Sequence, residues 1–125
     1  MENYTNHLPI RNWAEDDRPR EKLLMKGRQS LSDAELVAIL LNSGTRYESA
    51  LDLAKSILKK AHYNLMELSK MGIRELVTVR GIGEARAVTI LAALELGRRR
   101  SESDVLAKEK IGRSNDAWEI FRSTM

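Results

Sequence analysis

The sequence has no cysteine, only two prolines and few aromatic residues: two tryptophans, three tyrosines and one phenylalanine among 125 residues. The lack of cysteine excludes disulfides, cysteine-ligated zinc, iron–sulfur clusters and thiol catalysis. With only His7 and His62, we expect no histidine-rich metal site. No apolar run approaches the roughly 20 residues that span a bilayer, and the N-terminus lacks the basic and apolar regions of a signal peptide. These absences favour a cytoplasmic protein that does not contact membranes.

The charge balance is mildly basic, with 21 Lys and Arg against 18 Asp and Glu. Such a balance permits nucleic-acid binding without requiring it, and a solvated basic surface explains it equally well. The excess falls mostly within residues 70–100, where the basic residues are Lys70, Arg74, Arg80, Arg86, Arg98, Arg99 and Arg100 and the acidic ones are Glu75, Glu84 and Glu95.

Apolar residues recur at helical spacing almost throughout, and strand signals are poor. Ser32 and Glu35 form the pattern of a capping box, and Pro19 suits the first turn of an earlier helix that ends at Gly27. We therefore predict an all-α protein, a compact helical bundle. The expected helices run from about Pro19 to Gly27 and over residues 32–41, 48–61, 64–70, 73–79 and 83–97.

Two of these helices have apolar faces that predict core residues. The helix at 48–61 places Leu51, Ala54, Ile57 and Leu58 on one side. The helix at 83–97 has a main face of Ala87, Ile90, Leu91 and Leu94 and an opposite apolar side of Ala85, Val88, Ala92 and Leu96. A helix that is apolar on two sides is predicted to lie between neighbours or beneath a partner.

The two ends of the chain differ from its middle. Residues 1–12 are typical of an irregular arm that Trp13 anchors on the core, and residues 98–104 are polar and charged like a linker. The expected organisation is a helical domain over residues 1–100, followed by a linker and the start of a further domain over 101–125.

A final helical pattern over residues 114–125 contains Trp118 and Phe121. So short a helix cannot bury two large aromatic side chains by itself. It either folds back on the bundle or begins an element of a longer protein.

The most informative segment is the turn Gly81-Ile82-Gly83 between two expected helices. The first glycine permits a backbone conformation closed to residues with a Cβ, and the second lets a ligand or another backbone approach closely. Ile82 is expected to hold the turn on the core. No strand precedes this turn and no third glycine follows it, so it does not match the dinucleotide-binding pattern.

The first amides of a helix lack intrahelical acceptors and carry the positive end of the helix dipole, which suits a phosphate oxygen. Such contacts position a protein on a nucleic-acid backbone without reading bases. Glu84 suits the dipole but competes with a phosphate, and Arg98, Arg99 and Arg100 are possible additional contacts or a solvated helix end. The predicted DNA-binding residues are Arg80, Gly81, Ile82, Gly83, Glu84, Ala85 and Arg86, with donors in the amides of Gly81, Gly83, Glu84 and Ala85.

A second, degenerate turn of the same kind is suggested about 40 residues upstream. Leu36 and Ile39 precede Ser43-Gly44-Thr45, and Ala50 and Leu53 follow it. Two such units can pack as a pair and hold both strands of a duplex, although an ordinary helical connection explains the pattern equally well.

The acidic run Glu15-Asp16-Asp17 is interpreted as helix capping rather than metal binding, and His62 as a surface residue at a helix end. No Ser/His/Asp constellation is visible. We therefore expect no catalytic residue and no enzyme activity in this chain.

Three ordered stretches give the chain a family resemblance. They are Trp13 with Arg18-Pro-Arg-Glu-Lys-Leu-Leu24, Leu31-Ser-Asp-Ala-Glu-Leu-Val-Ala-Ile-Leu-Leu41 with Ser43-Gly-Thr45, and Val79-Arg-Gly-Ile-Gly-Glu-Ala-Arg-Ala87 with Ala92-Ala-Leu-Glu-Leu-Gly-Arg-Arg99. The last contains a pattern that resembles the helix-hairpin-helix motif of DNA-repair and recombination proteins. Together the stretches resemble the N-terminal part of the bacterial RadC family.

The resemblance implies a helix-hairpin-helix module beside a second, JAMM-type metalloprotease-like domain. The zinc motif of that domain is an upstream Glu, His-x-His and a following Asp. This chain has no His-x-His, so no zinc ligand is carried over. Some relatives of the motif bind a monovalent cation at the hairpin carbonyls, so such a cation is a possible cofactor here.

Two functions from different classes follow. The first is a module that binds DNA without sequence specificity through its phosphate backbone, in a protein linked to DNA repair. The alternative is a protein-interaction or dimerisation module that serves the missing hydrolase domain and uses the apolar C-terminal segment.

Overall fold

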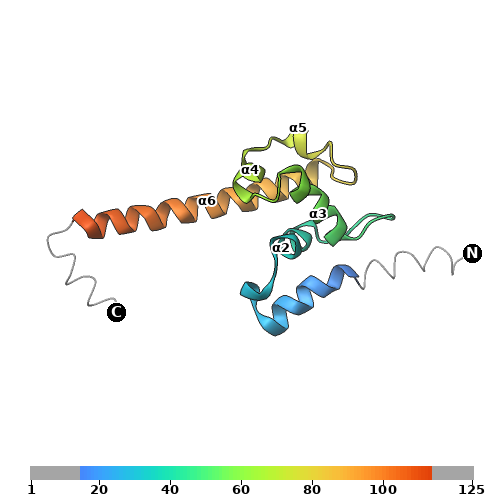
Figure 1. The fold of residues 1–125 in the computed structure, drawn as a ribbon, viewed down its shortest axis with the longest axis horizontal. Coiled ribbons are helices and arrows are strands. Elements are labelled where there is room, and N and C mark those ends of the chain that lie inside the picture. Colours follow the sequence, from blue (N-terminus) through green and yellow to red (C-terminus); the bar gives the residue numbers. More distant parts are fainter. Residues whose placement is uncertain (1–14, 114–125) are drawn as a thin grey trace, which may run out of the picture. The chain divides into compact units, whose positions relative to one another are not determined.

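The computed structural model describes residues 15–113, and every regular element in this range is a helix (Figure 1). The all-α prediction is therefore confirmed. The predictions for residues 1–12, Trp13 and residues 114–125 lie outside the described residues. A helix at residues 15–26 comes first, followed by η1 (Arg28–Ser30), α2 (Asp33–Leu41), α3 (Ala50–Lys60), α4 (Leu65–Lys70), α5 (Ile73–Leu76) and α6 (Glu84–Arg113).

The chain divides after Ala92 into two compact units. The first unit contains all elements up to the start of α6, and α6 continues into the second. Within residues 15–113, no helix has the length and hydropathy that a membrane span requires.

Local sequence signals set the start of α2. The Ser32 hydroxyl accepts a hydrogen bond from the Glu35 amide at 3.2 Å, and the Glu35 carboxylate accepts one from the Ser32 amide at 2.8 Å. The predicted capping box is thus confirmed. Lys22 of the first helix adds an ion pair to Glu35 at 3.1 Å. The Ser32 amide, and then Lys22, lower the pKa of the Glu35 carboxyl.

The first helix differs from its prediction. Residues 15–18 are already helical, so Pro19 does not lie at a helix start. Pro19 is buried, and Asp16, one turn earlier, is also buried and hydrogen-bonded to another part of the chain. These tertiary contacts extend the helix toward the N-terminus beyond the local signal at the proline.

The core is formed by buried side chains of α2, α3, α4, α5 and the first turns of α6. The largest fully buried side chains are Leu53, Ile57, Leu68, Leu76 and Ile90. The predicted face of α3 is correct for Ala54, Ile57 and Leu58, but Leu51 is only half-buried and Leu53 replaces it in the core. Leu53 is buried because it packs against the Gly81 turn, a contact between residues far apart in the sequence.

Two predictions for the last helices are corrected. Helix α5 is only four residues long and ends at Leu76 instead of Val79. On α6, Ala87 and Ile90 are buried as predicted, whereas Leu91 and Leu94 are half-buried. The opposite side of α6 is exposed, Val88 by 50% and Leu96 by 69%, so no neighbour within residues 15–113 covers it, and a partner on this side stays a prediction.

Helix α6 also does not end at Gly97, because it continues to Arg113 through the predicted linker. The polar residues stabilise it through pairs at helical spacing, since Arg98 contacts Glu102 at 2.7 Å and Arg99 contacts Glu95 at 2.9 Å. The expected domain boundary near residue 100 stays a prediction.

Candidate functional site

Two turns pack against each other: the first turn, residues 42–49 before α3, and the second turn, residues 77–83 before α6. Gly81 has a φ of 91°, a conformation that favours glycine. A Cβ built on Gly81 would lie 2.7 Å from Leu53 Cδ2 and 3.2 Å from Thr45 Cγ2. The expected special role of the first glycine is therefore confirmed, and it also permits close packing of the two turns.

Arg86 connects these turns through its guanidinium. Its Nη1 donates to the carbonyl of Gly81 at 3.1 Å, and its Nη2 donates to the carbonyls of Ser43 at 2.9 Å and Gly44 at 3.2 Å. The residue follows the second turn in sequence but holds the carbonyls of both. Its guanidinium is thus directed at the protein backbone.

In the first turn, backbone amides bind an oxyanion that the chain itself supplies. The buried carboxylate of Asp16 accepts hydrogen bonds from the Gly44 amide at 2.8 Å and the Ala50 amide at 2.7 Å. Ala50 is the first residue of α3, so Asp16 caps a helix other than its own. Ser49, the N-cap residue, accepts from the Asp52 amide at 3.2 Å. The acidic run was interpreted as capping the helix that follows it, but residues 15–17 lie within that helix, and Asp16 holds the first amide of a helix 34 residues downstream instead.

Gly44 is required for this arrangement because the backbone folds back on itself. A Cβ at Gly44 would overlap the carbonyl oxygen of Glu48 and approach the Ala50 nitrogen to 2.7 Å.

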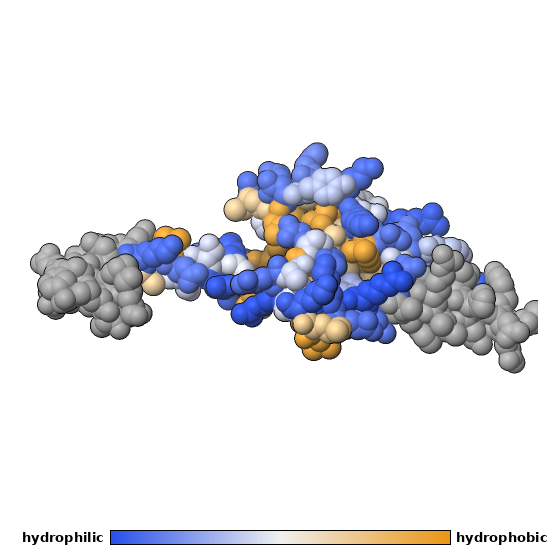
Figure 2. Space-filling view, turned by 60° about the horizontal axis from the view of Figure 1, so that its bottom comes forward, coloured by the Kyte–Doolittle hydropathy of each residue, from blue (hydrophilic) through white to orange (hydrophobic). Residues whose placement is uncertain are grey.

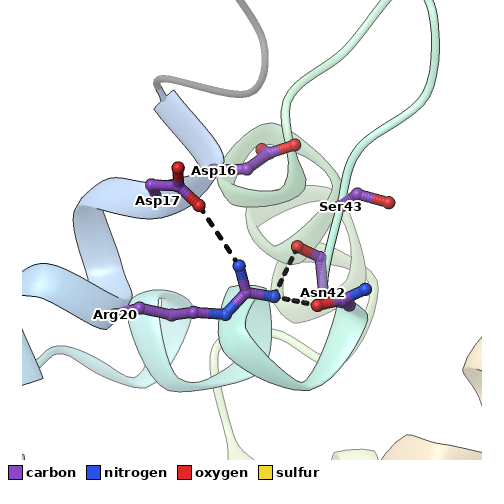
Figure 3. A pocket seen from close by; sticks show the side chains of 5 residues that line it. All are labelled: Asp16, Asp17, Arg20, Asn42 and Ser43. Atoms are coloured by element: carbon purple, nitrogen blue, oxygen red, sulfur yellow. Dashed lines mark hydrogen bonds and ion pairs between the residues drawn. The ribbon is translucent and has the colours of Figure 1, made fainter.

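Arg20 of the first helix also holds the first turn (Figure 3). Its guanidinium donates to the carbonyl of Asn42 at 2.9 Å and to the side-chain oxygen of that residue, and pairs with Asp17 at 3.3 Å. These groups line a polar pocket of about 320 Å³ together with Asp16 and Ser43. Arg20 and Asp16 both bind groups of the turn, so they dock the first helix on it.

The second turn has the same kinds of donors without an internal acceptor. A Cβ at Gly83 would meet nothing within 4 Å, so the backbone there is open to an approaching group. Ile82 is buried beneath the turn as predicted, with 4% of its surface exposed. Among the backbone amides that have no hydrogen-bond acceptor within residues 15–113 are the four predicted donors of this turn, those of Gly81, Gly83, Glu84 and Ala85.

Most carbonyls of the second turn are occupied. Those of Val79 and Gly83 accept from the amides of Ile82 and Ala87, each at 3.0 Å, and that of Gly81 accepts from Arg86. A monovalent cation at this turn stays a prediction, and it would compete with the Arg86 guanidinium for the Gly81 carbonyl.

Arg98, Arg99 and Arg100 belong to the second unit, and each is engaged with acids of α6. Arg98, and then Arg99, lower the pKa of the Glu95 carboxyl to about 2. All three arginine side chains are more than half exposed, so these pairs are screened by solvent. Their phosphate contacts stay a prediction.

Sequence reasoning did not identify an aromatic group beside the second turn. The guanidinium carbons of Arg46 and Arg80 each lie 6.0 Å from the centre of the Tyr47 ring. The available signal was the adjacency of Arg46 and Tyr47 in the first turn, but their proximity to Arg80 depends on how the turns pack.

The comparisons with known proteins are consistent with the motifs. The UPF0758 N-terminal family model matches residues 10–88. A UPF0758 protein from Flavobacterium johnsoniae is 53% identical over 117 residues, which cover 94% of this chain and 51% of the relative. One from Alkaliphilus oremlandii is 42% identical over 125 residues, 100% of this chain and 54% of the relative. One from Porphyromonas gingivalis is 43% identical over 112 residues, 89% and 49% respectively.

No solved structure matches the chain significantly. The chain spans about half the length of the curated relatives that it matches. The matched region includes both turns, the helices from α2 to α5 and the start of α6. The chain therefore belongs to the UPF0758 family, the RadC-like family that its motifs indicate.

Proposed function

We propose that the first unit is a helix-hairpin-helix module that binds the phosphate backbone of DNA without reading its sequence. The phosphate oxygen would accept hydrogen bonds from the amides at Gly83, Glu84 and Ala85, at the positive end of α6. Arg80, which is exposed on the same turn, would add positive charge.

The observation that carries this proposal is the contrast between the two turns. In the first, two amides hold the carboxylate of Asp16, an internal oxyanion. In the second, the corresponding amides have no acceptor within the described part of the chain. The open turn thus offers to an external oxyanion the type of site that the closed turn offers to Asp16.

Gly83 supports the same assignment. Its φ is not positive, and a side chain there would enter open space. Internal packing therefore does not require glycine at this position. Close approach of a phosphate to the helix N-terminus does favour it.

Arg86 has a different role in this proposal from the phosphate contact expected from its position. Because its guanidinium binds carbonyls of both turns, we assign it as a positioning residue that fixes the open turn against the closed one. Glu84 remains the group that opposes binding, since its carboxylate lies in the first turn of α6.

The test is a fluorescence-anisotropy titration of a labelled DNA duplex at several salt concentrations, with Gly83→Asp and Gly83→Asn compared with the parent. Both replacements are good N-cap residues, and circular dichroism would verify folding. They differ in charge, and the aspartate would occupy the amides as Asp16 does in the first turn. We expect Gly83→Asp to weaken binding about tenfold or more, because a charge-assisted hydrogen bond contributes about 1.5–3 kcal/mol, and Gly83→Asn to weaken it less.

Binding should fall with salt at a log–log slope of roughly −0.9 for each phosphate contacted. Absence of binding at low salt, or equal binding by the parent and both variants, would remove the second turn as a phosphate site.

A protein-interaction module is the second candidate, favoured by apolar side chains on the surface. Leu24 and Met25 of the first helix are 81% and 83% exposed, and Val88 of α6 is 50% exposed. The partner that we propose for this alternative is a domain like the half of the relatives that this chain does not cover. Association through such side chains would depend little on salt, which separates the two candidates.

A further inference from the structure

Tyr47 lies near two arginines at the surface of the first unit. Tyr47 is 75% exposed to solvent. Arg46 precedes it in the same turn, whereas Arg80 comes from the second turn, and both guanidinium carbons are 6.0 Å from the ring centre. An exposed aromatic residue alone is ordinary, but one that lies near cations from two separate turns combines a π face with positive charge. Figure 2 shows that side chains on this unit are mainly hydrophilic around its apolar centre.

The backbone of the first turn holds Tyr47 in place. The Thr45 amide donates to the carbonyl of Glu48 at 2.8 Å. The Thr45 hydroxyl accepts from the amides of Tyr47 at 3.2 Å and Glu48 at 3.1 Å. These three bonds close a tight loop with Arg46 and Tyr47 at its tip. The exposed ring is therefore supported by a fixed backbone.

The same loop adjoins the proposed phosphate site. Thr45 lies against Gly81, where a Cβ would approach its Cγ2 to 3.2 Å. Arg80 precedes Gly81 directly, so the ring that lies near Arg80 also lies beside the open turn. The aromatic residue and the open amides thus belong to the same pair of packed turns.

The ring of Tyr47 is accessible to a third group because the residue is 75% exposed. A distance of 6.0 Å is the outer limit of a cation–π contact, so neither guanidinium stacks on the ring at van der Waals distance. A nucleic-acid base has a planar π face that stacks on tyrosine, and the phosphates that flank it are attracted to arginine. Bases inside a duplex are already stacked, so the base that fits this surface is an unpaired one.

We propose that Tyr47, with Arg46 and Arg80, binds an unpaired base next to the duplex whose backbone occupies the second turn. This inference rests on the proposed function and names its substrate class: duplex DNA that adjoins a single-stranded segment.

The experiment compares three labelled ligands of the same duplex sequence: blunt, with a single-stranded extension, and with an extension of abasic residues. The abasic extension has the same phosphates but no base to stack. The parent should bind the base-containing extension roughly 5- to 100-fold more tightly than the abasic one. Tyr47→Ala should abolish this difference and leave blunt-duplex affinity unchanged, and Tyr47→Phe should retain it.

Tyr63→Ala is the matched control. Tyr63 is 67% exposed but follows the C-terminal end of α3, whereas Tyr47 precedes its N-terminal end. This variant should behave like the parent. If the parent binds the blunt duplex but has no preference between the two extensions, or if Tyr47→Ala keeps the preference, the unpaired-base site is refuted and the phosphate site stands. If the parent binds none of the ligands, both are refuted.

Discussion

Removal of the Asp16 carboxylate tests the most unusual contact of the fold. In Asp16→Ala, the amides of Gly44 and Ala50 lose their acceptor. Ala50 has no exposed surface, so water cannot easily replace the carboxylate there. Asp16→Asn keeps one acceptor oxygen but directs an amide group at the second donor.

The expected cost follows from the number and type of bonds lost. A hydrogen bond to a charged group contributes about 1.5–3 kcal/mol, so Asp16→Ala should reduce the free energy of unfolding by about 3–5 kcal/mol. Asp16→Asn, which loses the charge and one of the two bonds, should reduce it by about 2–3 kcal/mol. Ser49→Ala, which removes an ordinary N-cap on the same helix, should cost only about 1 kcal/mol. A typical domain has about 5–15 kcal/mol in total.

Urea unfolding followed by far-UV circular dichroism would measure these losses as shifts of the midpoint at constant m-value. Formate supplies a small external carboxylate, so it should raise the midpoint of Asp16→Ala more than that of the parent. If Asp16→Ala unfolds at the same urea concentration as the parent or Ser49→Ala, the claim that this turn is a strong oxyanion site is wrong.

Three further predictions concern single residues. Gly81→Ala should destabilise the protein by about 1–3 kcal/mol because of its positive φ and its contact with Leu53, whereas Gly83→Ala should cost at most about 1 kcal/mol; thermal unfolding would compare them, and equal losses would contradict the assignment. Arg86→Lys should weaken DNA binding at every salt concentration without reducing the log–log slope, as expected of a positioning residue, and a slope reduced by about one phosphate would instead indicate direct contact. Because the pKa of Glu95 is depressed to about 2 from 4.5, its pairing stabilises α6 above pH 4.5 and is lost as the pH falls toward 2. Carboxyl NMR titration should find the pKa of Glu95 near 2. In the parent, part of the helical circular-dichroism signal should be lost as Glu95 is protonated, and Glu95→Gln should lack that pH-dependent loss.

Local signals allowed much of the fold to be predicted. The capping box at Ser32 and Glu35 and the helix that begins at Glu84 depend on neighbours within one turn. The positive φ of Gly81 was predicted from its residue type, because glycine has no Cβ. Each of these interactions joins residues close in the sequence, so the pattern of residue types contains the necessary information.

The predictions that were wrong or incomplete depend on contacts between residues far apart in the sequence, or on a local signal that was not used. Asp16 binds amides 28 and 34 residues away in the sequence, and Arg86 binds carbonyls 42 and 43 residues away. No local sequence pattern indicates contacts at such separations. The continuation of α6 was missed for another reason. Its polar composition is typical of a linker, but the spacing of Arg98 and Glu102 was available and favours a helix.

The candidate site was therefore only partly predictable. The motif indicated the turn at Gly81–Gly83 and its amides, and these remain the proposed donors. Three features could be identified only from the packed structure: the binding of Asp16 in the first turn, the hydrogen bonds of Arg86 to both turns, and the proximity of Tyr47 to Arg80.

The most direct test of the central claim is an NMR titration of the ¹⁵N-labelled chain with a short DNA duplex, read at the backbone amides. We expect saturable shifts at Gly83, Glu84 and Ala85, with much smaller shifts at Gly44 and Ala50, whose amides are occupied by Asp16. Saturable shifts that leave Gly83, Glu84 and Ala85 unaffected, or no shifts at low salt, would contradict this claim.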